Sequence, residues 1–194
     1  MKTRILAILE QSITVKKDYI EANADLLIAV VGKITRCLEN GGKILFFGNG
    51  GSAADAQHLA AEFVGRFAFD RHPLAAIALT TDTSIITSIG NDYSFDDIFL
   101  RQVMALGKKD DIAFGISTSG NSPNVVRALE WAQKHDIATI GLAGGNGGQM
   151  APLCDQLMAV TGPNTARIQE THILIGHILC AMTEEHLFPE QATK

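Results

Sequence analysis

Four hydroxyl side chains lie within six residues in the middle of the chain, directly before a proline. They are Ser117, Thr118, Ser119 and Ser122, and the proline is Pro123. Serine at an N-cap followed by proline is typical of a helix start, where free backbone N–H groups and the helix dipole favour an anion. Capping explains one hydroxyl but not four, and no nucleotide-binding P-loop signature follows. The pattern therefore predicts a site for a phosphate monoester held by neutral donors.

A glycine-rich loop, GNGGS, occupies residues 48–52. Glycine lets the backbone approach a ligand, and the helix that follows would offer N–H groups to an anion, although a tight turn that binds nothing has the same composition. Gly48, Gly50 and Ala53 also fit the dinucleotide-binding pattern. That pattern requires an acidic residue at the end of the second strand, where residues 78–80 read ALT. The loop therefore stays open between an anion site and a simple turn, and a dinucleotide is not expected.

Two pairs of polar residues could perform acid–base chemistry or bind a metal. His58 and Glu62 are four residues apart on the helix predicted after the glycine loop, so they share one face. Gln169 and His177 lie about two turns apart on the predicted last helix, among apolar residues. Taken alone, the first pair is typical of an exposed helix, and His177 is typical of a core histidine. The chemistry requires the two pairs to meet, which the spacing alone does not decide.

Alternating strand and helix patterns must position these residues. Buried strands are predicted at 43–47, 74–79, 111–116, 137–142 and 156–160, and helices at 53–66, 84–106 (broken near Gly90), 123–134 and 166–186. Two further helices fill residues 1–40 and end at Gly41 and Gly42. This series predicts one domain over 1–194, with a doubly wound α/β core at 43–187 around a five-stranded parallel sheet. Ligands of such sheets lie beyond the carboxyl ends of the strands.

Composition narrows the class of protein. The 194 residues, 46% hydrophobic and 19% charged, suit a folded domain and not a disordered chain. The net charge of −5 argues against a nucleic-acid partner. Three widely spaced cysteines indicate neither a disulfide framework nor a zinc knuckle, and favour a reducing compartment. No signal-peptide core and no run of ~20 apolar residues occurs, so a cytoplasmic protein without a membrane partner is expected.

Four segments together carry a resemblance to a known family. They are GNGGSAADAQHLAAEFVGR (48–66), ALTTDTSIITSIGND (78–92), GISTSGNSPNV (115–125) and RIQETHILIGHIL (167–179). In order and spacing they resemble the phosphoheptose isomerases, a family of sugar isomerase (SIS) domains. The resemblance implies a SIS fold and a homotetramer with active sites between subunits. It also implies conversion of sedoheptulose 7-phosphate to D-glycero-D-manno-heptose 7-phosphate through an enediol, the first step towards ADP- or GDP-heptose precursors.

The resemblance also implies roles for individual residues. It implies Glu62 as catalytic base and His177 as acid, and a zinc site formed by His58, Glu62, Gln169 and His177. The substrate contacts that it implies are Asn49, Gly50, Gly51, Ser52, Asn91, Asp92, Ser117, Thr118, Ser119, Ser122 and Gln169. One carboxylate can carry a proton between C1 and C2 while a second group exchanges protons with the oxygens. Because a zinc-bound carboxylate is a weaker base and an amide is a poor zinc ligand, the role of zinc stays open between polarising the carbonyl and organising the site.

Two non-enzymatic functions are alternatives to the isomerase. The ending HLFPEQ (186–191) resembles a non-catalytic SIS-fold protein that associates with a replication initiator. That relative lacks the carboxylate and the histidine at the positions of Glu62 and His177, and this chain has both. A regulatory domain that senses sugar phosphates would need the loops but no catalytic pair, and no DNA-binding segment is expected here. The sequence therefore favours the isomerase.

Overall fold

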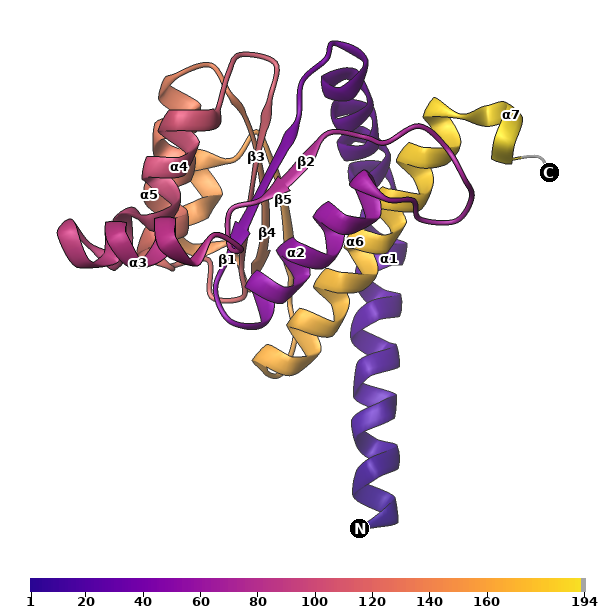
Figure 1. Cartoon of the computed structure of the whole chain (residues 1–194). Helices are drawn as coiled ribbons and strands as arrows, with labels where there is room; N and C mark the ends of the chain where they lie inside the picture. The colour runs from indigo at the N-terminus through magenta and orange to yellow at the C-terminus, as the bar shows by residue number, and fades with distance from the viewer. Residues whose placement is uncertain (193–194) are drawn as a thin grey trace.

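Five parallel strands form the central sheet of the structure, a computed structural model that describes residues 1–192 (Figure 1). The strands lie in the order β2-β1-β3-β4-β5. Their bounds are Ile44–Gly48 (β1), Ala76–Ala78 (β2), Ile112–Ser117 (β3), Ala138–Gly144 (β4) and Gln156–Val160 (β5). The chain passes from β1 outward to β2 and returns to β3 on the other side of β1, so the strand order reverses between β1 and β3. The predicted doubly wound α/β fold with five parallel strands is confirmed.

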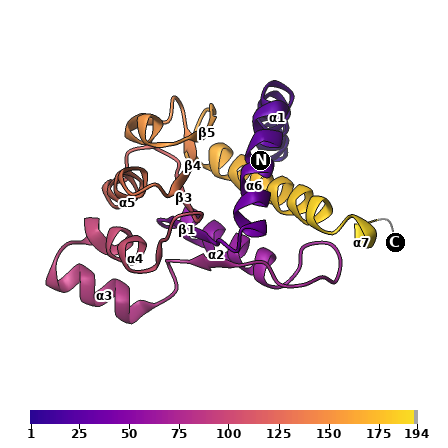
Figure 2. The same cartoon turned by 90° about the horizontal axis from the view of Figure 1, so that it is seen from above.

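Helices cover both faces of this sheet, as Figures 1 and 2 show. One face packs against α1 (Lys2–Glu39), α2 (Gly51–Val64) and α6 (Thr165–Leu187), and the other against α3 (Thr83–Asp92), α4 (Ile98–Leu106) and α5 (Pro123–Lys134). Side chains alternate along β1 accordingly: Ile44 and Phe46 belong to the first core cluster, and Leu45 and Phe47 to the second. Burial on both faces explains why the central strands are continuous apolar runs.

The helix predicted over 84–106 is interrupted later than expected. Gly90 lies inside α3, which continues to Asp92 and is followed by the short 3-10 helix η1 (Phe95–Asp97). The new start is set by Ser94, whose hydroxyl accepts a hydrogen bond from the Asp96 N–H. Two further short helices are η2 (Gly148–Leu153), after β4, and α7 (Pro189–Ala192). Within residues 1–192 no helix has both the length and the apolar character needed to cross a membrane.

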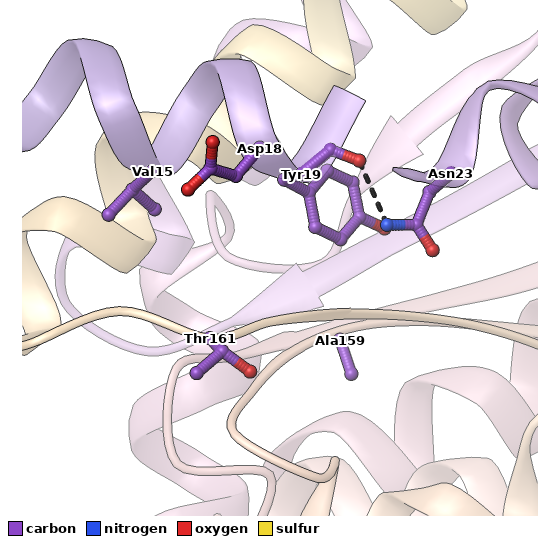
Figure 3. Close-up of a pocket in the computed structure, with 6 residues that line it drawn as sticks. All are labelled: Val15, Asp18, Tyr19, Asn23, Ala159 and Thr161. Atoms are coloured by element: carbon purple, nitrogen blue, oxygen red, sulfur yellow. Dashed lines mark hydrogen bonds between the residues drawn. The ribbon is translucent and has the colours of Figure 1, made fainter. Parts of the chain in front are cut away.

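The two predicted N-terminal helices form one long helix, α1, with a kink. The kink is at Asn23, whose backbone is not helical (φ −127°, ψ 17°). Its side-chain amide donates to the Tyr19 carbonyl oxygen at 2.8 Å and so replaces a backbone donor of the helix (Figure 3). A cavity of about 320 Å³ lies beside the kink, between α1 and the residues at the end of β5. The part of α1 before the kink projects beyond the body of the molecule (Figure 1).

Candidate active site

The two predicted ligand loops leave neighbouring strands at the point where the strand order reverses. β1 pairs with β3 in parallel, with Gly48 opposite Ile116. The glycine loop after β1 leads into α2 at Gly51, and the hydroxyl loop after β3 leads into α5 at Pro123. In an open α/β sheet this crevice is where ligands bind. The fold thus brings both loops to the place that the strand pattern predicts.

The glycine loop depends on a backbone conformation that only glycine adopts readily. Gly50 has φ 55° and ψ −119°, in the region that residues with a Cβ avoid. Asn49, just before it, is half-buried, and its side-chain amide forms two hydrogen bonds with the amide of Asn124 at the start of α5. Ser52 is buried in the first turn of α2, whereas Gly51 is exposed and lies against the side chain of Gln169. The loop therefore contacts both α5 and α6.

Three of the four predicted hydroxyls converge. The Ser117 Oγ lies 2.8 Å from the Ser122 Oγ and 3.3 Å from the Ser119 Oγ. Ser122 is the N-cap residue of α5, but its hydroxyl makes no capping bond to the helix. Thr118 is half-buried and takes no part in this hydroxyl network. The hydroxyl groups thus lie at a helix N-terminus without capping the helix. This leaves them free to bind a phosphate.

The two pairs of polar residues, on α2 and on α6, meet through their histidines. The Nε2 atoms of His58 and His177 are 2.7 Å apart, and the His58 Nε2 lies 3.6 Å from the Glu62 Oε1. A hydrogen bond at this distance needs one ring nitrogen to donate and the other to accept. The approach depends on Gly176, because a Cβ there would lie only 2.5 Å from the Leu59 Cδ2. The absence of one side chain on α6 therefore lets the helices come close enough for the pairs to touch.

A buried carboxylate beside this cluster has no counterpart in the sequence-based set. Asp55 is only 5% exposed and accepts two hydrogen bonds from the Gln169 Nε2, at 2.7 and 2.9 Å. Burial raises the pKa of the Asp55 carboxyl, although the bond from Gln169 and the nearby His58 and His177 oppose the shift. Asp55, His58 and Glu62 are spaced i, i+3, i+7 and so lie on one face of α2. This spacing is the signal that could have identified Asp55.

Two predicted substrate contacts lie away from the others. Asn91 and Asp92 are exposed at the end of α3, where the Asn91 amide donates to the Asp92 carboxylate at 2.8 Å. Figures 1 and 2 both place α3 on the opposite side of the sheet from α6. In the part of the chain that the structure describes, neither side chain hydrogen-bonds to any predicted site residue outside this pair. A single subunit therefore does not bring these two residues to the histidines.

The side chains predicted for zinc are of suitable types but are not arranged as a formed site. Within residues 1–192, no group of three or more histidine, cysteine, aspartate or glutamate side chains has the geometry of a metal site. Two imidazoles bound to one tetrahedral zinc at ~2.0–2.1 Å would hold their nitrogens about 3.3 Å apart, whereas the two Nε2 atoms are 2.7 Å apart. A small outward rotation of His58 and His177 would correct this. Gln169 directs its NH₂ group to Asp55, which leaves its carbonyl oxygen as the ligand atom.

A buried ion pair supports the end of α2, and the sequence pattern gives no hint of it. The side chains of Arg71 and Glu184 are each 1% exposed, with the Arg71 Nε 3.4 Å from the Glu184 Oε1. Arg71 also donates to the carbonyl oxygens of Glu62 and Phe63, at 2.9 and 2.8 Å, which terminates α2. Glu184 in turn accepts from the backbone N–H of Phe67 at 3.1 Å. This pair thus fixes the helix turn that carries Glu62.

One histidine in the core belongs to none of the predicted sets. His172 is fully buried on α6, and its Nε2 lies 2.9 Å from the carbonyl oxygen of Ala143 in β4. A carbonyl oxygen only accepts, so this nitrogen carries the proton of a neutral ring. Burial lowers the pKa of His172 to about 4, because the charged form would lose its hydration. The residue therefore docks α6 onto the sheet as a neutral donor.

Comparisons with known proteins show which family the chain is similar to. A family model for the SIS domain matches residues 5–144. The chain is 59% identical, over 173 residues, to a phosphoheptose isomerase of Nitratidesulfovibrio vulgaris strain Hildenborough, covering 89% of this chain and 83% of the relative. It is 51% identical, over 191 residues, to that of Aneurinibacillus thermoaerophilus, covering 97% and 96%.

The fold has a solved counterpart at high similarity. A structure of phosphoheptose isomerase from Neisseria gonorrhoeae superposes with a TM-score of 0.90 at 46% identity, over 95% of this chain and 98% of that one. The resemblance carried by the four sequence segments thus extends to the whole architecture. The chain belongs to the phosphoheptose isomerase family of SIS-domain enzymes.

Proposed function

We propose that this protein is an aldose–ketose isomerase that converts sedoheptulose 7-phosphate into D-glycero-D-manno-heptose 7-phosphate. The observation that carries the proposal is the meeting of His58 and Glu62 with His177, at 2.7 Å between the two ring nitrogens. It joins a carboxylate and an imidazole on a fold that also presents a hydroxyl-lined loop suited to a phosphate. Membership of the phosphoheptose isomerase family supports the choice of substrate.

In this mechanism the carboxylate of Glu62 moves the proton between carbons. It removes a proton from C1 of the ketose, which gives a 1,2-enediol, and returns a proton to C2 to form the aldose. The imidazole of His177 exchanges protons with the two oxygens. The cluster of Ser117, Ser119 and Ser122 binds the phosphate with the N-terminus of α5. Binding at that distant end orients the carbon chain towards Glu62.

We also propose zinc as the resident metal, held by His58, Glu62, Gln169 and His177. When bound, zinc acts as a Lewis acid towards the substrate oxygens. The donor types support this assignment, since imidazole and carboxylate are common zinc ligands and the amide of Gln169 is held in place by Asp55.

Assembly into a homotetramer is part of the proposal. The first half of α1 exposes five large apolar side chains, each 44–61% exposed, which form a stripe suited to an interface. These are Ile5, Leu6, Ile8, Leu9 and Ile13. A neighbouring subunit would also account for Asn91 and Asp92, which lie away from the histidines of their own chain. Light scattering at micromolar concentration measures the assembly directly, and a monomeric mass would refute it.

Cytoplasmic location also remains a proposal. The three cysteines are all unpaired in the structure, and two of them, Cys37 and Cys180, are buried. Free thiols of this kind are typical of proteins in a reducing compartment.

The test of the activity is direct. Purified protein is incubated with sedoheptulose 7-phosphate, and NMR follows the appearance of the aldose anomeric proton. Glu62→Gln is the matched control, because it keeps the shape of the side chain and removes the base. Product formation by the wild type and not by the variant supports the proposal. A folded wild-type protein that forms no aldose, with zinc supplied, would refute it.

A further inference from the structure

A pair of asparagines joins the two ligand loops. The Asn49 Nδ2 donates to the Asn124 Oδ1 at 2.8 Å, and the Asn124 Nδ2 donates back to the Asn49 Oδ1 at 2.9 Å. Asn49 belongs to the glycine loop after β1. Asn124 is the second residue of α5, next to the hydroxyl loop, and is only 2% exposed. Two segments that are 75 residues apart in the sequence are thus tied by a closed ring of two hydrogen bonds.

The pairing fixes which way the Asn49 amide faces. A free asparagine amide can rotate by 180° and exchange its oxygen for its nitrogen at little cost. A primary amide has two N–H donors and two acceptor lone pairs, and the ring with Asn124 uses one of each. Flipping Asn49 alone would set oxygen against oxygen and nitrogen against nitrogen. One N–H and one lone pair of Asn49 therefore remain for a ligand, in a fixed orientation.

Backbone hydrogen bonds from the first turn of α2 hold the glycine loop to its own helix, so its attachment to other segments depends on side chains. The loop reads Gly48-Asn49-Gly50-Gly51 before Ser52. Asn49 is therefore the one residue of residues 48–51 that has a side chain. Within the described residues, the side-chain hydrogen bonds from residues 49–51 to other segments are the two with Asn124. Glycine backbones sample many conformations, so a loop of this composition needs an external tie to stay in one of them. Asn124 supplies that tie from a buried position on a helix.

We infer that Asn124 is a positioning residue, which holds Asn49 in the orientation required by the sugar end of the substrate while the neighbouring hydroxyl loop holds the phosphate. The inference rests on the proposed function and deepens it. Asn124 acts through Asn49 and does not touch the substrate. Removing the Asn124 side chain should therefore disturb the orientation of the substrate's carbon chain and leave phosphate binding intact.

A double-mutant cycle tests this dependence. Asn49→Ala, Asn124→Ala and the double variant are compared with the wild type by kcat/KM for sedoheptulose 7-phosphate. Asn124→Ala should lower kcat/KM by roughly tenfold or more, since small displacements of a positioned group are costly to the rate. The double variant should be no worse than Asn49→Ala, because Asn124 acts only through Asn49. Losses that multiply in the double variant, or an Asn124→Ala enzyme within about twofold of the wild type, overturn the inference.

A second measurement separates positioning from general structural support. Inorganic phosphate binding, measured by calorimetry, should be unchanged in Asn124→Ala, because the serine cluster remains. A parallel loss of phosphate affinity would mean that Asn124 merely supports the hydroxyl loop, and would also overturn the inference. Gln133→Ala is the matched control, since it removes another amide from α5 whose hydrogen bond is to the carbonyl of Pro152. An inactive wild type would instead refute the proposed function, so the two failures are distinguishable.

Discussion

Adding a single methyl group at Gly176 should impair the active site more than the fold. The Cβ of Gly176→Ala would lie 2.5 Å from the Leu59 Cδ2, 2.9 Å from its Cδ1 and 3.2 Å from its Cγ. Leu59 is only 2% exposed, so its side chain cannot move out into solvent. Restoring an ordinary contact therefore requires α2 and α6 to separate by about 1 Å. His58 precedes Leu59 and His177 follows Gly176, so the two helix faces that carry the proposed site residues move apart directly.

The expected magnitudes differ for stability and for activity. Overpacking lowers the free energy of unfolding by about 1–3 kcal/mol. Replacing a helical glycine by alanine raises it by about 1 kcal/mol. The net loss of unfolding free energy is therefore at most about 2 kcal/mol. A displacement of about 1 Å in a catalytic geometry lowers the rate on the order of 10²-fold. The variant should therefore remain folded at 25 °C with kcat/KM reduced about a hundredfold.

The assay combines thermal or urea unfolding with steady-state isomerisation. Gly32→Ala is the control, since its added Cβ would meet only the end of the Arg36 side chain, at an ordinary 3.5 Å, and α1 should gain stability without loss of activity. Leu59→Ala combined with Gly176→Ala removes the clash and should recover much of the lost activity. Wild-type kcat/KM in Gly176→Ala would refute the idea that close helix approach sets the catalytic geometry.

Four further outcomes follow from the site. Glu62→Gln should abolish isomerisation and deuterium incorporation from heavy water together, by at least ~10²-fold; label exchange that persists without isomerisation would assign the base elsewhere. Ser122→Ala should raise KM more than it lowers kcat, and should leave affinity for unphosphorylated sedoheptulose unchanged. Metal analysis of untagged protein should find about one zinc per chain, and full activity after complete demetallation would exclude zinc from the reaction. Burial lowers the pKa of His172 in the folded protein to about 4. Its contribution to stability is therefore complete above the unfolded pKa near 6.5, and about 3 kcal/mol is lost as the pH falls towards 4. His172→Gln should lack this part of the pH dependence in urea unfolding.

The sheet and most helices are predictable from the sequence because their signals are local. Strands buried on both faces are apolar throughout, and the helix starts at the two loops have glycine, serine and proline signals. The break in the helix over 84–106 is placed too early because glycine is tolerated within a helix. Ser94, whose hydroxyl caps the next turn, is the residue that sets the new start.

The candidate site is only partly predictable because its parts come from distant segments. The meeting of His58 with His177 depends on the close approach of α2 and α6 at Gly176, which no pattern on either helix reveals. Asn124 is missed for a related reason, since its partner is 75 residues away and a buried asparagine on a helix has no signature of its own. Asp55 differs, because its i, i+3, i+7 spacing with His58 and Glu62 places all three on one face of α2 and could have been recognised in the sequence.

The position of α6 in the chain has a consequence for the protein's synthesis. All five strands are complete once Val160 has been made, and both ligand loops already exist by then. Gln169 and His177 come later, on a helix that also covers one face of the sheet. At ~5–20 residues per second, a ribosome needs roughly one to five seconds more to finish α6. During that interval the face of the sheet that α6 covers is only partly covered, by α1 and α2, and His58 has no His177 to contact. The last long helix therefore completes both the proposed site and the cover of this face of the sheet.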